Sequence, residues 1–120
     1  MVRLTIDLSA STRAAERLVA ALRTLILSTR GAPGCVDCAV WTGTEDVDES
    51  VVHYEERWLN EASMEGRVRS DAFTKVLEVV EGAHVAPRVE FDFVEKWMGL
   101  EYVERIRGAG GRRPFPPNVN

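Results

Sequence analysis

The chain has 120 residues, 45% of them hydrophobic, and a formal net charge of −4 at pH 7. These values are typical of one globular domain, and no apolar run approaches the ~20 residues that a membrane-spanning helix needs. Acidic and basic residues are interspersed without a basic stripe, so we expect neither a nucleic-acid partner nor a membrane partner. Residues 1–10 lack the apolar block of a signal peptide, which predicts a cytoplasmic protein.

The first two elements are a strand and a helix. Residues 2–8 alternate apolar and polar side chains, as a half-buried strand does. Apolar residues then recur at three- and four-residue spacing from about residue 12 to Thr29, which predicts an amphipathic helix ended by Gly31 and Pro33. Three hydroxyl side chains could cap its start: Ser9, Ser11 and Thr12.

Two strands are expected in the segment 33–58. It opens with the turn signal Pro33-Gly34, and residues 35–41 and 51–58 are rich in β-branched and aromatic side chains. A polar interval, residues 42–50, separates them.

One face of the second of these strands has an unusual composition. Val52, Tyr54, Glu56 and Trp58 share that face because strand side chains alternate. A carboxylate between two large aromatic side chains is uncommon on a hydrophobic core face. Either Glu56 lies at a wet rim or the face lines a cavity, and the pattern leaves both alternatives open.

The two cysteines form the motif Cys35-Val36-Asp37-Cys38. No second CxxC or histidine pair completes a zinc site, and redox CxxC pairs begin a helix, whereas this pair lies in a predicted strand. An offset of three in a strand sends Cys35 and Cys38 to opposite faces. We therefore expect two semi-buried thiols, no metal site, and redox chemistry only as a minor alternative.

The second half of the chain predicts two helices, a strand and a short helix. Asn60 and Ser70 are N-cap residues, so we expect a short helix to a break near Arg69 and another over 71–81, ended by Gly82. The last strand is predicted over 88–97 and a helix over 100–107; four residues of that strand should share a face, namely Val89, Phe91, Phe93 and Trp97. Residues 109–120, rich in Gly, Pro and Arg, are expected to form a flexible tail.

The order strand, helix, strand, strand, helix, strand is that of the α+β ferredoxin-like βαββαβ fold. Its helices cover one face of an antiparallel sheet. We expect the uncovered face to carry an aromatic side chain such as Trp58 or Trp41 and therefore to need a partner. A homodimer through the sheet face is the simplest such partner.

Three segments resemble the antibiotic biosynthesis monooxygenase family: Pro33-Gly34-Cys35, Tyr54-Glu55-Glu56-Arg57-Trp58 and Ser70-Asp71-Ala72-Phe73. The interval from Trp58 to Phe73 matches the interval that the family shows between its strand Trp and its helix Phe. The resemblance covers about residues 2–97, and residues 99–108 resemble a C-terminal extension in one bacterial branch. It implies a domain over 1–108 that forms a dimeric α+β barrel.

Some members of that family oxygenate quinols or polycyclic aromatics with O2 and no metal, flavin or haem. The resemblance therefore implies a cofactor-independent monooxygenase acting on a small aromatic or quinol substrate, with no cofactor. In that interpretation Trp58 is an apolar wall, Tyr54 binds a phenolic oxygen and Glu56 takes the proton. Four residues would contact the substrate: Trp58, Arg67, Met64 and Phe73.

The chain departs from the family pattern at two positions. Many relatives carry histidines where this chain has Arg67 and Ala72, so the usual general base is missing. Arg67 could stabilise an anionic intermediate, although a solvated arginine is the simpler expectation. The haem-degrading branch needs a histidine in the second helix, and residues 73–81 contain none.

A second interpretation needs no catalysis. A non-catalytic dimeric barrel would bind an aromatic ligand or serve as an interaction scaffold, with Trp58 as core and Glu56 as a satisfied surface or interface carboxylate. The oxygenase interpretation predicts an apolar cavity with a perturbed titrating group, whereas the second predicts a filled core or a groove without one. The fold by itself decides neither.

Overall fold

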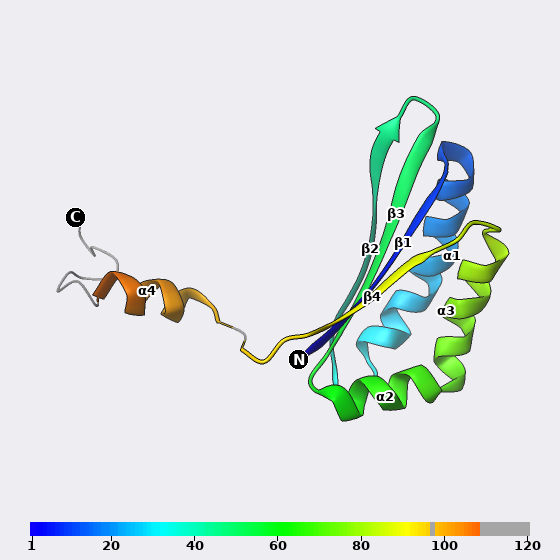
Figure 1. Cartoon of the computed structure of the whole chain (residues 1–120). Helices are drawn as coiled ribbons and strands as arrows, with labels where there is room; N and C mark the ends of the chain where they lie inside the picture. The colour runs from blue at the N-terminus through cyan, green and yellow to red at the C-terminus, as the bar shows by residue number, and fades with distance from the viewer. Residues whose placement is uncertain (97, 109–120) are drawn as a thin grey trace.

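The computed structural model describes residues 1–96 and 98–108, which form one antiparallel sheet with three helices on one side and a fourth helix that stands apart (Figure 1). The sheet order is β2-β3-β1-β4, so the predicted ferredoxin-like α+β fold is confirmed. The elements are β1 (Val2–Ser11), α1 (Thr12–Arg30), β2 (Cys35–Asp46), β3 (Glu49–Trp58), α2 (Glu61–Arg69), α3 (Asp71–Gly82), β4 (Arg88–Phe93) and α4 (Leu100–Gly108). Within the described residues, no helix is both long and apolar enough to span a membrane.

The helix boundaries follow from local capping. Ser11 is the N-cap of α1 and accepts a hydrogen bond from the backbone of Ala14 at 3.2 Å. Asn60 caps α2 in the same way. Ser70 both ends α2 and caps α3, because its hydroxyl accepts a bond from the backbone of Phe73 at 3.2 Å. The predicted break between the two helices is confirmed.

The central hairpin is longer than the sequence indicated. The predicted polar interval over 42–50 continues the β2–β3 ladder to a two-residue turn, with Asp46 opposite Glu49. β2 is an edge strand, so polar side chains there keep contact with water while the backbone pairs with β3. A prediction from composition alone therefore assigns such a polar strand to a loop.

A β-bulge corrects the expected orientation of the cysteines. Cys35 pairs with Trp58 and Cys38 pairs with Glu56, with the bulge between Cys35 and Asp37. Residues directly opposite each other project to the same side of a sheet. Both cysteines therefore lie on the helix side, and the prediction of opposite faces was wrong because it assumed a regular strand.

The side chains on the two faces of the sheet also differ from the prediction. Trp58 lies on the covered face and is buried, so it is not part of the open face. Trp41 is on the open face, 45% exposed, and stacks on His53 with ring centroids 5.4 Å apart. The rest of that face carries mainly ion pairs: Arg3–Asp92, His53–Asp7 and Arg57–Glu55.

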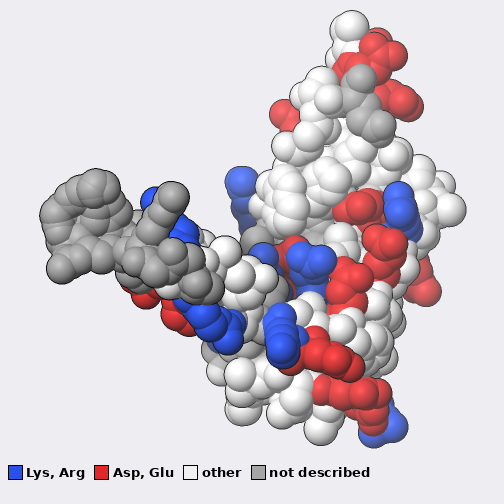
Figure 2. Space-filling model, turned by 60° about the vertical axis from the view of Figure 1, so that its left-hand side comes forward, with Lys and Arg blue, Asp and Glu red and all other residues white. Residues whose placement is uncertain are grey.

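The open face is thus largely polar. Figure 2 turns the left-hand side of Figure 1 forward, and blue and red side chains are interspersed across the middle of that view. Apolar contact between two open faces is therefore not the interaction that would join two copies of the chain. The homodimer through this face stays a prediction.

The C-terminal part differs from the prediction in one respect. β4 ends at Phe93, four residues before the predicted end. The α4 helix forms as expected but stands clear of the domain (Figure 1). The Cα radius of gyration is 18.5 Å, whereas about 13.6 Å is usual for a compact chain of this length. Trp97 and the predicted flexible tail, 109–120, lie outside the described residues.

Candidate functional site

A buried carboxylate lies at the centre of the domain. Glu56, on β3, is fully buried, and its Oε1 accepts hydrogen bonds from Trp58 Nε1 at 2.9 Å and Arg67 Nε at 3.0 Å. Its Oε2 accepts from Arg67 Nη2 at 2.8 Å and from the Tyr54 hydroxyl. Four donors therefore saturate the carboxylate.

The local structure explains how these groups meet. Strand alternation directs Tyr54, Glu56 and Trp58 to the face that the helices cover. α2 begins at its Asn60 cap and crosses this face, which brings Arg67 over the sheet with its side chain 4% exposed. The expectation of a solvated Arg67 was wrong. Glu56 lies neither at a wet rim nor at a surface, but in a buried ion pair.

Two further residues extend this cluster. Arg67 Nη2 donates to Thr29 Oγ1 at 3.1 Å, and the Thr29 hydroxyl donates to the backbone oxygen of Leu25 at 2.7 Å. The Cys38 thiol donates to the Tyr54 hydroxyl oxygen at 3.4 Å. We call the whole set the Glu56 network: Thr29, Cys38, Tyr54, Glu56, Trp58 and Arg67.

The sequence offered only a weak signal for Thr29 and Cys38. Thr29 lies in the apolar stripe of α1, where a hydroxyl side chain needs a partner. In the described residues, no buried side-chain nitrogen or oxygen lacks a hydrogen bond.

Aromatic rings complete the surroundings of Arg67. Its guanidinium carbon lies 5.7 Å from the ring centre of Trp58 and 5.3 Å from that of Phe73. Both distances are within the range of cation–π contact. Arg67 is therefore held by a carboxylate and by two aromatic rings.

The protonation states follow from burial and from Glu56. Burial, together with the charge of Glu56, raises the pKa of Tyr54, and burial raises the pKa of Cys38 to about 11. Burial lowers the pKa of Arg67, but the hydrogen bonds and charge of Glu56, together with Tyr54, outweigh this effect and the net pKa is raised. At neutral pH the network contains a phenol, a thiol and a charged guanidinium.

A pocket of about 330 Å³ borders the network on one side of α2. Trp58 and Arg67 reach it from the network, and we call it the Trp58 pocket. The residues that line it are Ala32, Pro33, Trp58, Ser63, Gly66, Arg67, Ser70 and Ala72. This volume is at the lower end of the range for small-molecule sites.

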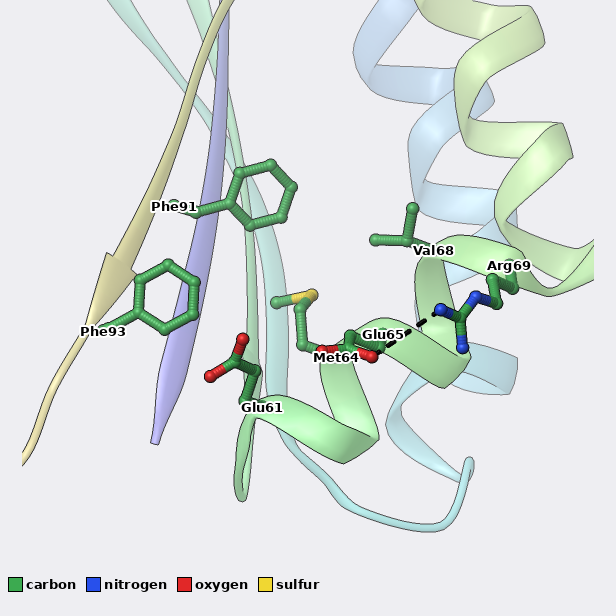
Figure 3. A pocket seen from close by; sticks show the side chains of 7 residues that line it. All are labelled: Glu61, Met64, Glu65, Val68, Arg69, Phe91 and Phe93. Atoms are coloured by element: carbon green, nitrogen blue, oxygen red, sulfur yellow. Dashed lines mark ion pairs between the residues drawn. The ribbon is translucent and has the colours of Figure 1, made fainter.

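A second hollow, of about 320 Å³, lies between α2 and β4 (Figure 3). We call it the α2–β4 groove. Phe91 and Phe93 project from β4 toward α2, where Met64 and Val68 face them. Its other lining residues are Glu61, Glu65 and Arg69.

The structure brings together most of the predicted site residues. Tyr54, Glu56, Trp58 and Arg67 form one hydrogen-bonded cluster, and Phe73 packs on Arg67. Met64 instead lines the α2–β4 groove. Among the described residues, no cluster of three or more His, Cys, Asp or Glu side chains could hold a metal ion.

The fold is shared with several proteins of known structure. A provisionally named antibiotic biosynthesis monooxygenase from Deinococcus radiodurans is 22% identical, with a TM-score of 0.67 over 82% of this chain and 97% of that one. One from Nitrosomonas europaea, also provisionally named, is 13% identical, with a TM-score of 0.63 over 80% and 100%. A conserved protein from Methanosarcina mazei is 18% identical, with a TM-score of 0.62 over 78% and 92%.

None of the curated proteins matches this sequence. The family model for antibiotic biosynthesis monooxygenase matches residues 1–79, which contain β1 through most of α3 and therefore the whole Glu56 network. The chain belongs to the antibiotic biosynthesis monooxygenase family.

Proposed function

We propose that the protein is a cofactor-independent monooxygenase that uses O2 on a small aromatic or quinol substrate bound in the Trp58 pocket. The observation that carries this proposal is the buried cation beside an aromatic wall: Arg67 and Trp58 both line the pocket. Membership of the family supports the reaction class. The pocket volume, about 330 Å³, suits a ligand of one to three fused rings.

The chemistry would reside mainly in the substrate. A deprotonated quinol or anthrone can pass an electron to O2, and an anthrone methylene then becomes a carbonyl while O2 supplies one atom to the product and one to water. The protein must stabilise the anion and exclude bulk water. Glu56 and Thr29 engage Nε and Nη2 of Arg67, which leaves Nη1 as the donor for a substrate oxygen.

Glu56 and Tyr54 would act mainly by positioning. With four donors on its carboxylate, Glu56 could take a substrate proton only if the substrate displaced one of them. The raised pKa of Tyr54 favours a protonated donor over a base. We therefore propose that both residues hold Trp58 and Arg67 in the geometry that binds the substrate anion.

One observation favours the second candidate function, a barrel that binds an aromatic ligand without catalysis. Every buried polar group of the Glu56 network already has a protein partner, so no unpaired base is supplied to the pocket. In that case Trp58 and Arg67 would still bind an aromatic anion.

Oxygen uptake by metal-stripped protein tests the proposal. A panel of quinols and anthrones would be compared for the wild type, Trp58→Phe and Arg67→Lys. Trp41→Phe and Arg69→Lys are matched controls, because Trp41 lies on the open face and Arg69 is an exposed neighbour on α2. Gel filtration and circular dichroism would verify that each variant is folded.

We expect uptake above autoxidation that falls at least tenfold in the two site variants and persists in the controls. Quenching of Trp58 fluorescence by the same compounds, without oxygen uptake, would support the binding function instead. Equal uptake in all variants would show that the Trp58 pocket is not where the reaction occurs.

A further inference from the structure

Another pocket, of about 340 Å³, lies between α1 and α3, which run side by side in opposite directions (Figure 1). We call it the α1–α3 pocket. It lies where α1 begins and α3 ends, whereas the Trp58 pocket is lined by Ala32 and Ala72, at the other ends of these helices. The two pockets are therefore separate. The floor of the α1–α3 pocket consists of apolar side chains in or against the core: Ala14, Leu18, Val79 and Ala83.

The rim of this pocket carries side chains of opposite charge. Arg17 of α1 and Glu78 of α3 both line it, and His84 lines it where the chain leaves α3. All three residues are exposed. In the described part of the chain, none of these side chains makes a hydrogen bond or an ion pair, so Arg17 and Glu78 border one pocket without pairing with each other. A ligand with one positive and one negative group can therefore engage both.

His84 has a backbone conformation that is unusual for a histidine. Its φ is 57°, and among the described residues it is the one non-glycine residue with a positive φ. It follows Ala83, the C-cap of α3, at a position where glycine is common because a Cβ is unfavourable there. Residues held in such conformations are often found at ligand-binding sites. Here the histidine lines the α1–α3 pocket.

The charges of the two walls define how a ligand lies between them. Glu78 favours a cation, and so does the C-terminal end of α3, which has no basic residue in its last turn to offset the helix dipole. Arg17, on the facing helix, favours a carboxylate, which a guanidinium can bind with two parallel hydrogen bonds. Packed helices lie about 8–10 Å apart, so long side chains from both can reach one small molecule.

We propose that the α1–α3 pocket binds an α-amino acid with an aliphatic side chain. Arg17 binds the carboxylate, Glu78 binds the ammonium group, and His84 supplies a further hydrogen bond at the rim. The aliphatic side chain lies on the apolar floor. The volume of the pocket, about 340 Å³, accommodates a ligand of this size. Because this pocket is separate from the Trp58 pocket, the binding is independent of the proposed reaction.

Calorimetric titration with L-leucine and two analogues tests the proposal. Isocaproate has the carbon skeleton of L-leucine without the ammonium group, and isoamylamine has it without the carboxylate. None of the three compounds is aromatic, so none is the kind of ligand proposed for the Trp58 pocket. We expect L-leucine to bind and each analogue to bind at least tenfold more weakly, because each lacks one charge-assisted contact. Equal binding of all three compounds, or no binding of L-leucine at millimolar concentration, would overturn the proposal.

Variants without charge then connect each group of the ligand with its residue. Arg17→Gln should weaken the binding of L-leucine at least tenfold and leave that of isoamylamine unchanged. Glu78→Gln should also weaken the binding of L-leucine, and leave that of isocaproate unchanged. Arg23→Gln and Glu81→Gln are matched controls, because both residues are exposed on the same helices and neither lines the pocket. If the controls lose as much affinity as the site variants, the ligand is bound elsewhere and the proposal fails.

His84→Gly distinguishes a role in binding from a role in stability. Glycine adopts a positive φ without strain, so the variant should melt at a higher temperature than the wild type. The same variant should bind L-leucine more weakly, because it lacks the imidazole. A higher melting temperature with undiminished affinity for L-leucine would contradict the role of His84 in the site.

Discussion

The guanidinium of Arg67 and the carboxylate of Glu56 form a two-point ion pair in which both side chains are almost completely buried. The pair joins α2 to β3, and so it fixes the helix that separates the Trp58 pocket from the α2–β4 groove. Removing one member of such a pair leaves the other charge desolvated and uncompensated. The stability of the domain and the shape of the site therefore depend on the same contact.

We predict that Arg67→Met lowers the free energy of unfolding by about 3–5 kcal/mol. Arg69→Met, two residues along the same helix, is the matched control. Its ion pair with Glu65 is long, at 3.7 Å, and exposed, so the loss should be below about 0.5 kcal/mol. Urea denaturation at neutral pH measures both. Similar losses in the two variants would contradict a structural role for the buried pair.

A double variant refines this prediction. Glu56→Leu combined with Arg67→Met removes both charges, so it should be less destabilised than the sum of the single variants. The recovery should be incomplete, because Tyr54 and Trp58 lose their acceptor. Strict additivity in urea denaturation would be the opposing result.

Stability should decrease in alkaline solution because of Cys38. Its pKa rises from an ordinary value of 9.0 to about 11 through burial. Between these pH values the folded chain keeps the thiol proton and the unfolded chain has lost it, so the free energy of unfolding falls as pH rises. Below pH 9.0 both states are protonated and this contribution is constant.

The matching measurement is a set of urea midpoints between pH 8 and about 11 for the wild type and Cys38→Ala. The variant should lose part of the alkaline slope. The raised pKa of Tyr54 also lowers the free energy of unfolding as pH rises, so Tyr54 should account for the slope that remains in the variant. Parallel curves for the two proteins would show that Cys38 does not contribute.

Replacing either of two glycines by alanine should change the stability of the fold, in opposite directions at the two positions. Gly34 has φ of +86°, and an added Cβ would lie 2.6 Å from Ser63 Oγ, so Gly34→Ala should lower stability by at least about 1 kcal/mol. Gly66 lies inside α2 with open space around it, so Gly66→Ala should raise stability by about 0.5–1 kcal/mol. Thermal denaturation distinguishes the two, and a shift of the same sign in both would contradict this account.

The cysteines should be unreactive in the folded protein. Burial raises the pKa of Cys35 and the nearby charge of Glu56 raises it further, so little thiolate is present at neutral pH. Iodoacetamide labelling followed by mass spectrometry should modify Cys35 slowly and Cys38 only after unfolding. Rapid modification of either thiol in folded protein would favour the redox interpretation of the CxxC motif.

Local patterns in the sequence determined the element order and most of the boundaries. Alternation identified β1, three- and four-residue spacing identified α1, and Ser70 marked the junction of α2 and α3. These signals depend only on neighbours in the chain, through side-chain period and capping hydrogen bonds. Alternation also placed Tyr54, Glu56 and Trp58 on one face, which is why the sequence could nominate them as a group.

The tertiary structure determined how buried these side chains are and which partners they contact. Whether Arg67 is solvated or buried depends on where α2 crosses the sheet, and Thr29 is a partner only because α1 packs beside it. The β-bulge after Cys35 shifts the register by one residue, which puts Cys35 and Cys38 on the same face of the sheet. No pattern in the sequence of the strand predicted this bulge. Contacts between residues far apart in the chain set burial and charge pairing, so periodicity could group Tyr54, Glu56 and Trp58 but could not show that Arg67 neutralises Glu56.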